Sequence, residues 1–389
     1  MSQTSTYSQT YLPTFHSYQN EYLRRLETLV NIDSGTGHVE GIEEIAIYLK
    51  HWLAELDFTV TLHPTDHFGP NLVARRRGKG TKRILLAGHI DTVYKTGDAR
   101  SHPFTLRDGR AYGPGVSDMK SGVLMGIYAA RALIEAGFDH YGELVMLWNN
   151  DEEVGSPCSK HLISEIAQQV DIGLVLEPSR VQNQVTVARK GADKYILEIT
   201  GIPAHSGVEP QKGRSAVLEL AHKIIAIHNL HALFPGVTFN VTRISSNEQL
   251  NIVPDHARCW ITVRALSKEM LDAANSALEQ IMLNCNVPGT RASLVLNHGR
   301  RPYEMTPEIT KLFSLASEEG EALGLHLEGI TQGGVSDGNN LMEAGIPTLD
   351  GLGQTGNGDH NLEIENVLLD TIPLRGALLA GVMQRVGEL

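Results

Sequence analysis

Short apolar runs alternate with longer segments of helical periodicity over the first half of the chain. The apolar runs have the length of β-strands and lie at 58–63, 71–76, 83–89, 142–150 and 171–177. Apolar residues recur at helical spacing in four other segments, at 13–31, 38–54, 121–137 and 156–169. Apolar strands that alternate with helices are typical of a sheet covered on both faces. The pattern predicts an α/β fold with a mixed, largely parallel sheet flanked by helices.

The pattern changes near residue 190, where half-exposed strands replace the continuous apolar ones. Strands are expected at 193–201, 237–244, 257–265 and 292–297, with helices at 215–228 and 267–285. This β-α-β-β-α-β order is the ferredoxin-like arrangement. After Pro302 the alternation of helices and strands resumes. The sequence therefore predicts one domain formed by 1–190 and 302–389, and a ferredoxin-like α+β domain inserted at 191–301.

Composition and charge limit the classes of partner. A length of 389 residues favours two domains. The net charge of −12 argues against nucleic acid and against an anionic membrane as the main partner. The one basic run, at 74–83, is expected to be a solvated loop between two strands. We expect a small-molecule ligand and neither nucleic acid nor membrane.

The cysteines and the first residues indicate a cellular location. Cys158, Cys259 and Cys285 form no CxxC pair and no disulfide framework, which suits a reducing compartment. The segment 1–15 is polar and lacks the basic start and apolar core of a signal peptide. The sequence contains no run of about 18 apolar residues, the length needed to span a membrane. We expect a soluble, cytoplasmic protein.

Polar residues that can bind metals or transfer protons follow several of the predicted strands. Each has a simpler interpretation, as a hydrogen-bonded structural histidine or as part of a solvated acidic loop. Because the carboxyl ends of parallel strands meet at one edge of a sheet, however, these side chains are expected to converge. The residues concerned are His89, Asp91, Asp118, Asp151, Glu152, Glu153 and Glu177.

Converging carboxylates repel one another unless positive charge lies among them. Two Zn²⁺ ions about 3.5–4 Å apart would supply that charge and would accept histidine and carboxylate ligands. Such a pair of ions with one bridging carboxylate needs about five protein ligands. One more imidazole must therefore come from elsewhere in the chain.

Four segments together resemble one family. The segments "GHIDTVY", "GPGVSDMKSG", "NNDEEVGS" and "LEPS", in this order and spacing, look like the di-zinc aminoacylase/carboxypeptidase family of metallopeptidases. The likeness is strongest to the bacterial glutamate carboxypeptidases that cleave folates, and it extends from "NIDSGTGH" to the C-terminal helix. It implies a di-zinc exopeptidase-like fold, with a catalytic zinc-binding domain and an inserted dimerisation (lid) domain.

The resemblance also implies the roles of the converging residues. Asp91 would orient a ligand histidine, and Glu152 would act as the general base that takes a proton from the attacking water and passes it to the leaving nitrogen. Asp118 would bridge the two metal ions. Asp359 stands in the C-terminal loop "TGNGDHNLEIEN" where the relatives usually carry a small residue. The implied metal ligands are His89, Asp118, Glu153, Glu177 and, from this loop, His360.

The inserted domain carries further candidates in "GIPAHSGVEPQKGRSA" and "QLNIVPDHA". By itself, His205 reads as a surface-loop histidine. The resemblance implies that it reaches the active site of a second subunit and stabilises the oxyanion, which makes a homodimer necessary. Asn251 matches another residue of the same polar cluster.

The segments "GRRPYEM" and "GGVSDGNN" resemble those that bind the substrate carboxylate. Arg301 could form a bidentate pair with that carboxylate, and a surface or interdomain salt bridge is the alternative. Gly333 and Gly334 would let backbone amides approach it. Arg264 lies on a predicted strand and could either pack or bind.

These inferences favour a zinc-dependent hydrolase that cleaves the amide bond of small N-acyl or peptidyl amino acids, with a C-terminal glutamate as the expected released residue. Cobalt or manganese could replace zinc. A deacylase of other N-acyl amino acids, or a dipeptidase, is the alternative within the same class. A non-catalytic binding protein with the same fold is the alternative outside it.

Overall fold

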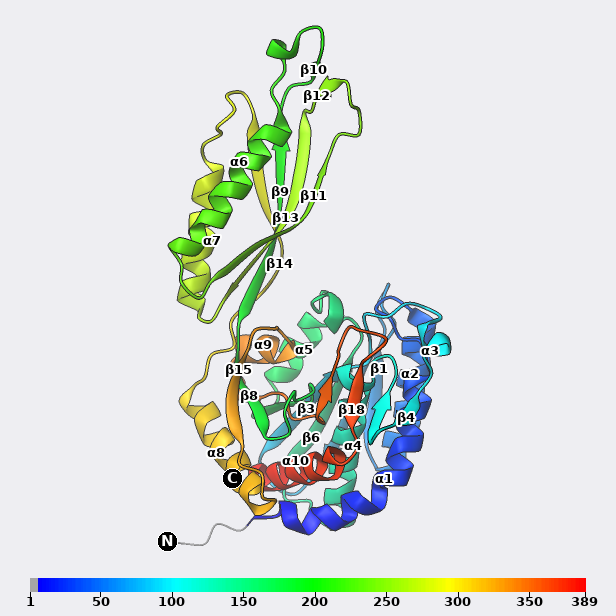
Figure 1. The fold of residues 1–389 in the computed structure, drawn as a ribbon. Helices are drawn as coiled ribbons and strands as arrows, with labels where there is room; N and C mark the ends of the chain where they lie inside the picture. Colours follow the sequence, from blue (N-terminus) through cyan, green and yellow to red (C-terminus); the bar gives the residue numbers. More distant parts are fainter. Residues whose placement is uncertain (1–5) are drawn as a thin grey trace. The chain divides into compact units, whose positions relative to one another are not determined.

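The computed structural model describes residues 6–389, which form two compact units (Figure 1). The first unit comprises 6–187 together with Met305–Thr331 and Ser336–Leu389. The second comprises Ala188–Glu304 and the short segment Gln332–Val335. The second unit overlaps the range 191–301 and also includes one segment from the C-terminal part of the chain. The expected domain bounds and the expected role of this unit in dimerisation stay predictions.

A six-stranded sheet forms the centre of the first unit, with strand order β1-β2-β6-β3-β7-β16. The bounds are β1 (Thr59–His63), β2 (Asn71–Arg77), β3 (Arg83–His89), β6 (Glu143–Asn149), β7 (Ile172–Val175) and β16 (Thr348–Leu349). β6, β3, β7 and β16 are parallel, whereas β1 and β2 pair antiparallel at one edge. The prediction of a mixed, largely parallel sheet is confirmed.

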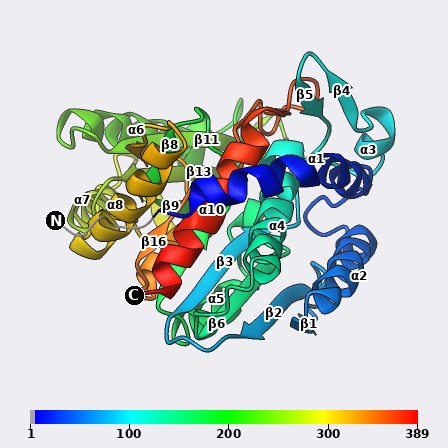
Figure 2. The same ribbon diagram turned by 90° about the horizontal axis from the view of Figure 1, so that it is seen from below.

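Helices cover both faces of this sheet, which explains why its central strands are continuously apolar. On one face α4 (Ser121–Glu135) and α10 (Thr371–Gly387) contact β3, and α1 (Ser8–Val30) crosses over both helices (Figure 2). On the other face Leu85 and Val145 pack with Ile163 of α5 (Lys160–Ala167) and Leu341 of α9 (Asp337–Glu343). α2 (Val39–Glu55) lies beside β1 and β2, and α8 (Pro307–Ala322) lies beside α10.

A second, smaller sheet in the first unit has the order β17-β18-β5-β4. The bounds are β4 (Thr105–Arg107), β5 (Arg110–Tyr112), β17 (Gly356–Asn357) and β18 (Asn366–Leu368), with the short helix α3 (Asp98–Ser101) preceding it. β5 and β18 pair antiparallel, with Tyr112 opposite Asn366. The chain that follows β5 and the chain that precedes β18 therefore leave this sheet at the same end. Separately, β8 (Gln184–Arg189) pairs with β15 (Glu328–Gln332).

The second unit is built on an antiparallel sheet of order β11-β13-β9-β14. Its elements are β9 (Gly191–Thr200), α6 (Ala216–Asn229), β11 (Thr238–Ser246), β13 (His256–Ala265), α7 (Lys268–Met282) and β14 (Arg291–Arg300), with the minor strands β10 (Ala204–His205) and β12 (Ile252–Val253). Leu197, Ile261 and Val263 from the sheet share a core with Leu220 of α6 and Leu271 of α7. The predicted β-α-β-β-α-β order is present.

Two local expectations differ from the structure. α1 begins at Ser8 rather than near residue 13 and contains Pro13, because buried Tyr11 and Phe15 extend the packing of α1 against its neighbours. In the basic run, Arg75 lies within β2 and pairs with Glu143 at 2.8 Å, so only 78–82 forms the loop. The three cysteines are unpaired. No helix within 6–389 combines the length and apolarity required to cross a membrane.

Candidate metal centre and active site

Three parallel strands deliver the candidate residues to one edge of the main sheet. β3 lies between β6 and β7, and the last residue of β3, His89, is opposite Asn149, the last residue of β6. Glu152 and Glu153 follow β6 in a short 3₁₀ helix, η2 (Glu152–Val154), and Glu177 follows β7 by two residues. The expected convergence at the carboxyl ends of the strands is therefore present.

His89 is held between two carboxylates, with only 1% of its surface exposed. Its Nδ1 lies 3.0 Å from the backbone oxygen of Asp91 and 3.4 Å from Asp91 Oδ1. Its Nε2 lies 3.0 Å from Asp118 Oδ1 and 3.8 Å from Glu177 Oε1. Asp91 thus engages Nδ1 and leaves Nε2 directed at the acidic cluster, the arrangement required of an imidazole that binds a metal through Nε2.

Asp91 also holds the loop that carries the two adjacent glutamates. Its carboxylate accepts hydrogen bonds from the backbone N–H of Glu152 at 3.2 Å and of Glu153 at 3.3 Å. The Thr36 hydroxyl donates a third bond to it at 2.7 Å. One buried carboxylate therefore fixes both the histidine at the end of β3 and the start of η2.

Asp118 and His360 meet through the small sheet. Asp118 lies in η1 (Val116–Lys120), shortly after β5, and His360 lies in the loop between β17 and β18. His360 Nε2 is 3.2 Å from Asp118 Oδ2 and 3.3 Å from Glu153 Oε2. His360 has a left-handed backbone with φ of 63°, a conformation that is uncommon outside glycine. The antiparallel pairing of β5 with β18 brings the two loops together.

Burial, hydrogen bonds and neighbouring charges shift several pKa values in this cluster. Burial disfavours the charged form of Asp118. The His360 and His89 imidazoles nevertheless hold the pKa of Asp118 below its usual range. Hydrogen bonds to Asp118 and Glu153 raise the pKa of His360 to about 10. Burial, opposed by His360 and reinforced by Asp118, raises the pKa of Glu153 to about 7. Burial and the Asp118 charge also raise the pKa of Glu177.

The donor set fits divalent zinc. Ligand atoms of His89, Asp118 and Glu153 all lie within 4.8 Å of one another. Glu153 Oε1 is buried and has no hydrogen-bond partner, which is costly for a carboxylate oxygen unless a cation binds it. Two imidazoles with three carboxylates are ligands that Zn²⁺ accepts. The two oxygens of Asp118 face different histidines, so the ligands divide into a group with His89 and Glu177 and a group with Glu153 and His360.

Glu365 positions Asp118, and the sequence carries no local signal for this role. Glu365 is 1% exposed, and its carboxylate accepts hydrogen bonds from the backbone N–H of Ser117 at 2.8 Å, Asp118 at 3.0 Å and Gly115 at 3.2 Å. The Tyr94 hydroxyl donates another. Burial raises the pKa of Glu365 to about 7. The residue lies in the polar stretch "NLEIEN", where nothing local distinguishes it from exposed Glu363.

The largely buried carboxylate of Asp359 forms an ion pair with Arg180. Only 7% of its side chain is exposed, and its Oδ2 lies 2.6 Å from Nη2 of Arg180. Arg180 comes three residues after Glu177, and Asp359 immediately precedes His360. The ion pair therefore connects two loops that each carry a candidate metal ligand.

A buried network of hydrogen bonds holds the chain segments on both sides of η2. Asp337 Oδ2 accepts a hydrogen bond from Asn149 at 2.6 Å, and its Oδ1 accepts one from Ser156 at 2.6 Å. Asp151 accepts hydrogen bonds from the hydroxyl of Ser159 at 2.5 Å and from its backbone N–H at 3.2 Å. Asp151, expected among the converging acids, is thus engaged in holding the loop.

The remaining candidates belong to the second unit. His205 lies in β10 and pairs with Ile252 of β12, and the backbone N–H of Ser206 donates to the oxygen of Asn251 at 3.0 Å. The structure therefore places His205 and Asn251 on adjacent chain segments. His205 is exposed.

The carboxylate-binding candidates make contacts within the second unit. Arg301 Nη1 lies 2.6 Å from Asp272 Oδ1. This is an exposed salt bridge, the kind of contact given above as the alternative to carboxylate binding. Arg264 donates to the carbonyl of Gly333 at 2.8 Å, and Arg189 donates to that of Gly334 at 3.3 Å. Arg189 was not identified from the sequence. These two arginines hold the glycine segment through its carbonyl groups.

The parallel strands end in one imidazole and two carboxylates, and loops of the small sheet add Asp118 and a second imidazole. This is the arrangement of a metal-dependent hydrolase. The chain belongs to the peptidase family M20/M25/M40, whose sequence profile matches residues 85–385. It is therefore a hydrolase, and the resemblance inferred from its sequence motifs is confirmed.

Two relatives by sequence and one solved structure are similar to two thirds of this chain or more. The chain is 31% identical over 376 residues to carboxypeptidase G2 of Pseudomonas sp. (strain RS-16), covering 95% of this chain and 90% of that protein. It is 27% identical over 288 residues to succinyl-diaminopimelate desuccinylase of Nitrosomonas europaea, covering 69% and 74%. The crystal structure of aminopeptidase PepT from Bacillus cereus superposes with a TM-score of 0.79 at 24% identity, covering 95% of this chain and 98% of that chain. Carboxypeptidases and deacylases are thus both represented.

Proposed function

We propose that this protein is a di-zinc carboxypeptidase that hydrolyses the amide bond of N-acyl or peptidyl amino acids and releases a C-terminal glutamate. One observation carries the proposal: Asp118 lies between His89 and His360, with Nε2 atoms 3.0 Å and 3.2 Å from its two oxygens. Similarity to carboxypeptidase G2 over 95% of the chain supports the carboxypeptidase assignment.

Five residues would hold the metal ions. His89 and Glu177 would bind one ion, Glu153 and His360 the other, and Asp118 would bridge them. When bound, zinc lowers the pKa of a water molecule toward about 7 and polarises the scissile carbonyl. Asp91 keeps His89 in the correct tautomer, and the Glu365 carboxylate holds the backbone that presents Asp118.

Glu152 is the proposed general base. Its backbone N–H donates a hydrogen bond to Asp91, and in η2 it directly precedes Glu153, one of the proposed ligands. From there its carboxylate would take the proton of the attacking water and deliver it to the leaving nitrogen. Its neighbour Glu153 faces His360, and in this proposal the two adjacent glutamates would have different roles.

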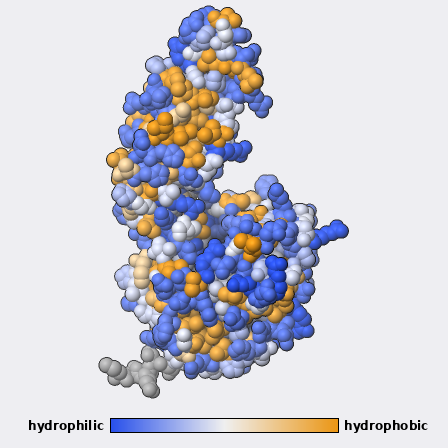
Figure 3. Space-filling view, viewed as in Figure 1, coloured by the Kyte–Doolittle hydropathy of each residue, from blue (hydrophilic) through white to orange (hydrophobic). Residues whose placement is uncertain are grey.

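The second unit would complete the site in a cytoplasmic homodimer. His205 would stabilise the oxyanion in the partner's active site, with Asn251 in the same polar cluster. Exposed apolar side chains on this unit support a contact with a second copy: Val217 is 40%, Leu218 51% and Ile225 61% exposed along α6. Figure 3 shows hydrophobic patches on its surface.

The same unit would bind the free carboxylate of the substrate. Arg301 is 43% exposed and its partner Asp272 is 41% exposed, so a substrate carboxylate could replace Asp272 at modest cost. The backbone amides of Gly333 and Gly334 would assist, with their carbonyls held by Arg264 and Arg189.

The main alternative is a deacylase of other N-acyl amino acids or a dipeptidase. Similarity to a succinyl-diaminopimelate desuccinylase supports the deacylase alternative. The non-catalytic alternative is disfavoured by family membership together with the presence of every proposed ligand and of Glu152.

A substrate panel tests the proposal. The zinc-loaded protein is assayed against N-acyl and N-aminoacyl derivatives of glutamate, aspartate and neutral amino acids, with α-amidated analogues as controls. The proposal expects the highest kcat/KM for glutamate derivatives and large losses on amidation. A preference for neutral amino acids would support the deacylase or dipeptidase, and no hydrolysis of any member would contradict both. In the same assay Arg301→Ala should lower kcat/KM for free-acid substrates about ten- to a hundredfold more than for amides.

A further inference from the structure

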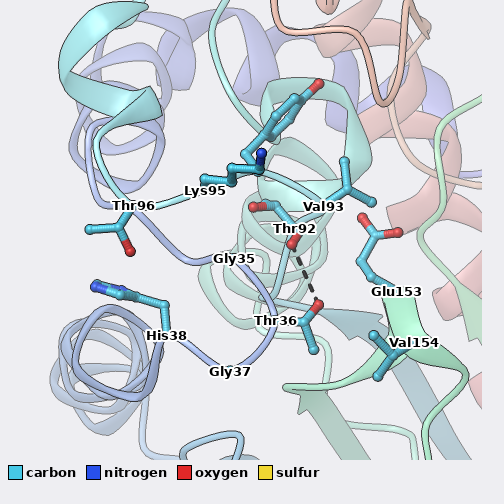
Figure 4. Close-up of a pocket in the computed structure, with 11 residues that line it drawn as sticks. Gly35, Thr36, Gly37, His38, Thr92, Val93, Lys95, Thr96, Glu153 and Val154 are labelled. Atoms are coloured by element: carbon cyan, nitrogen blue, oxygen red, sulfur yellow. Dashed lines mark hydrogen bonds between the residues drawn. The ribbon is translucent and has the colours of Figure 1, made fainter. Parts of the chain in front are cut away.

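A pocket of about 590 Å³ opens beside the proposed metal centre within the first unit (Figure 4). It lies between the loop joining α1 to α2 and the loop that follows β3, and it reaches η2. Its volume is within the range of small-molecule sites, about 300–1,000 Å³. The residues that line it include His38, Val93, Lys95, Thr96, Glu153 and Val154.

The end of the pocket next to the metal centre is apolar apart from one ligand. Figure 4 shows Val93, Glu153 and Val154 on the same side of the pocket. Val93 is 41% exposed and Val154 is 46% exposed, although both are aliphatic. A hydrocarbon segment that continues from a carbonyl held near Glu153 would cover both valines and remove them from water.

The rest of the pocket lining is largely polar and includes one lysine, Lys95. Figure 4 shows the side chains of His38 and Thr96 facing one another across from Glu153. Lys95 is exposed, and its ammonium makes no ion pair with any residue within 6–389. In a protein of net charge −12, a lysine without an ion pair in a pocket is an attractive partner for an anion.

We propose that this pocket binds the acyl portion of the substrate, and that Lys95 selects acyl chains ending in a carboxylate. The chain class is an ω-carboxyacyl group, with its methylenes against Val93 and Val154 and its terminal carboxylate at Lys95. This inference rests on the proposed function, because it assumes that the scissile carbonyl is held at the neighbouring centre. It concerns the acyl chain of the substrate, whereas the proposed residues of the second unit would bind the free carboxylate of the amino acid.

Matched pairs of substrates test the role of Lys95. N-succinyl, N-glutaryl and N-adipoyl derivatives of the preferred amino acid are compared with the butyryl, pentanoyl and hexanoyl derivatives of the same chain lengths. The measured quantity is the ratio of kcat/KM within each pair. At the best-fitting length, Lys95→Met should lower this ratio about fivefold, the effect of a solvent-exposed ion pair, and Lys95→Glu should lower it further. Lys50→Met, at an exposed lysine of α2 outside the pocket, should leave the ratio unchanged.

A binding measurement gives a readout that does not depend on turnover. Succinate, glutarate and adipate are titrated into the zinc-loaded protein by calorimetry, beside butyrate, pentanoate and hexanoate. Both acids of a pair share the near carboxylate, so the difference in Kd reports the far one. One dicarboxylate should bind about fivefold more tightly than its partner in the wild type, and Lys95→Met should abolish the difference.

Val93→Trp tests the location independently, since an indole in the pocket should lower kcat/KM for hexanoyl relative to acetyl substrates. Ratios unchanged in both Lys95 variants at all three lengths, with equal Kd values within each pair, would overturn the inference. Lys95-dependent binding of a dicarboxylate by a protein that hydrolyses no panel member would instead contradict the proposed function and support the pocket assignment.

Discussion

His360 Nε2 lies 3.2 Å from Asp118 Oδ2, although the two residues are 242 positions apart in the chain. The contact exists because β5 and β18 pair and deliver their loops to the same end of the small sheet. It joins the C-terminal loop to the centre formed at the ends of β3, β6 and β7. Several expected outcomes depend on this arrangement.

The first prediction concerns the general base. Glu152→Gln should retain both metal ions, because Glu152 is not among the ligands, and should lower kcat by about 10²–10⁴-fold through loss of proton transfer. Metal content by mass spectrometry and hydrolysis rates are measured on the same preparation. Glu44→Gln, at an exposed glutamate of α2, is the matched control and should behave as wild type. Near-normal turnover by Glu152→Gln would refute the assignment.

The second prediction concerns the division of the ligands into two groups. His360 is 55% exposed, so His360→Ala should fold normally, lose the ion shared with Glu153 and keep the ion at His89 and Glu177. Metal analysis after dialysis should therefore give about one ion per chain instead of two. Retention of two ions would show that His360 is not a ligand.

The third prediction concerns protons released on metal binding. The pKa of His360 is raised to about 10, so in the metal-free protein its imidazole carries a proton at pH 7. Burial raises the pKa of Glu153 to about 7, so this carboxyl binds a proton more readily than an ordinary glutamate does. A ligand must lose its proton to bind metal, so affinity should rise with pH through this range. Calorimetry at pH 7 in buffers of different ionisation enthalpy should show release of at least about one proton. Binding heats independent of the buffer would contradict this.

The fourth prediction concerns Glu365. A glutamine cannot accept all the hydrogen bonds that the Glu365 carboxylate receives from three backbone N–H groups and Tyr94, so Glu365→Gln should destabilise the protein by about 1–3 kcal/mol. Because the backbone of Asp118 would shift, zinc should also dissociate faster to a chelator. Glu363→Gln is the control, since the Glu363 side chain is 76% exposed. A loss of stability with unchanged metal dissociation would limit Glu365 to a structural role.

The fifth prediction tests whether His205 acts across a dimer. Glu152→Gln and His205→Ala homodimers should both be nearly inactive, because one oxyanion donor is worth about 10²–10³-fold. When the two variants are unfolded and refolded together in equal amounts, half of the dimers are mixed and each mixed dimer has one complete site. Activity should return to about one quarter of wild type if the two sites are independent. No recovery would mean that His205 does not serve the partner's site.

Much of the central fold was predictable because its signals are local. Strands β3, β6 and β7 appear in the sequence as continuous apolar runs, since both faces of these strands are buried. The alternation in β9 and β13 indicates a sheet covered on one face. The placement of His89, Glu152, Glu153 and Glu177 follows from the rule that the carboxyl ends of parallel strands meet.

Other features were decided by tertiary structure alone. α1 begins at Ser8 and includes Pro13 because burial of aromatic residues outweighs the missing hydrogen bond. No local pattern distinguishes Glu365, which is buried under the Asp118 loop, from exposed Glu363 in the same stretch. Arg180 and Asp359, which are 179 positions apart in the chain, form an ion pair.

The sequence by itself determined the element types, the buried strands and the chemistry at their ends, because residue periodicity and strand-end polarity are properties of short segments. Tertiary structure alone decided how the β5–β18 pairing brings His360 to Asp118, and which carboxylates support the ligands rather than join them. It also decided where Lys95 and the two exposed valines form one pocket. These relationships depend on backbone pairing and burial between distant segments, and neither leaves a signal within any single stretch of the chain.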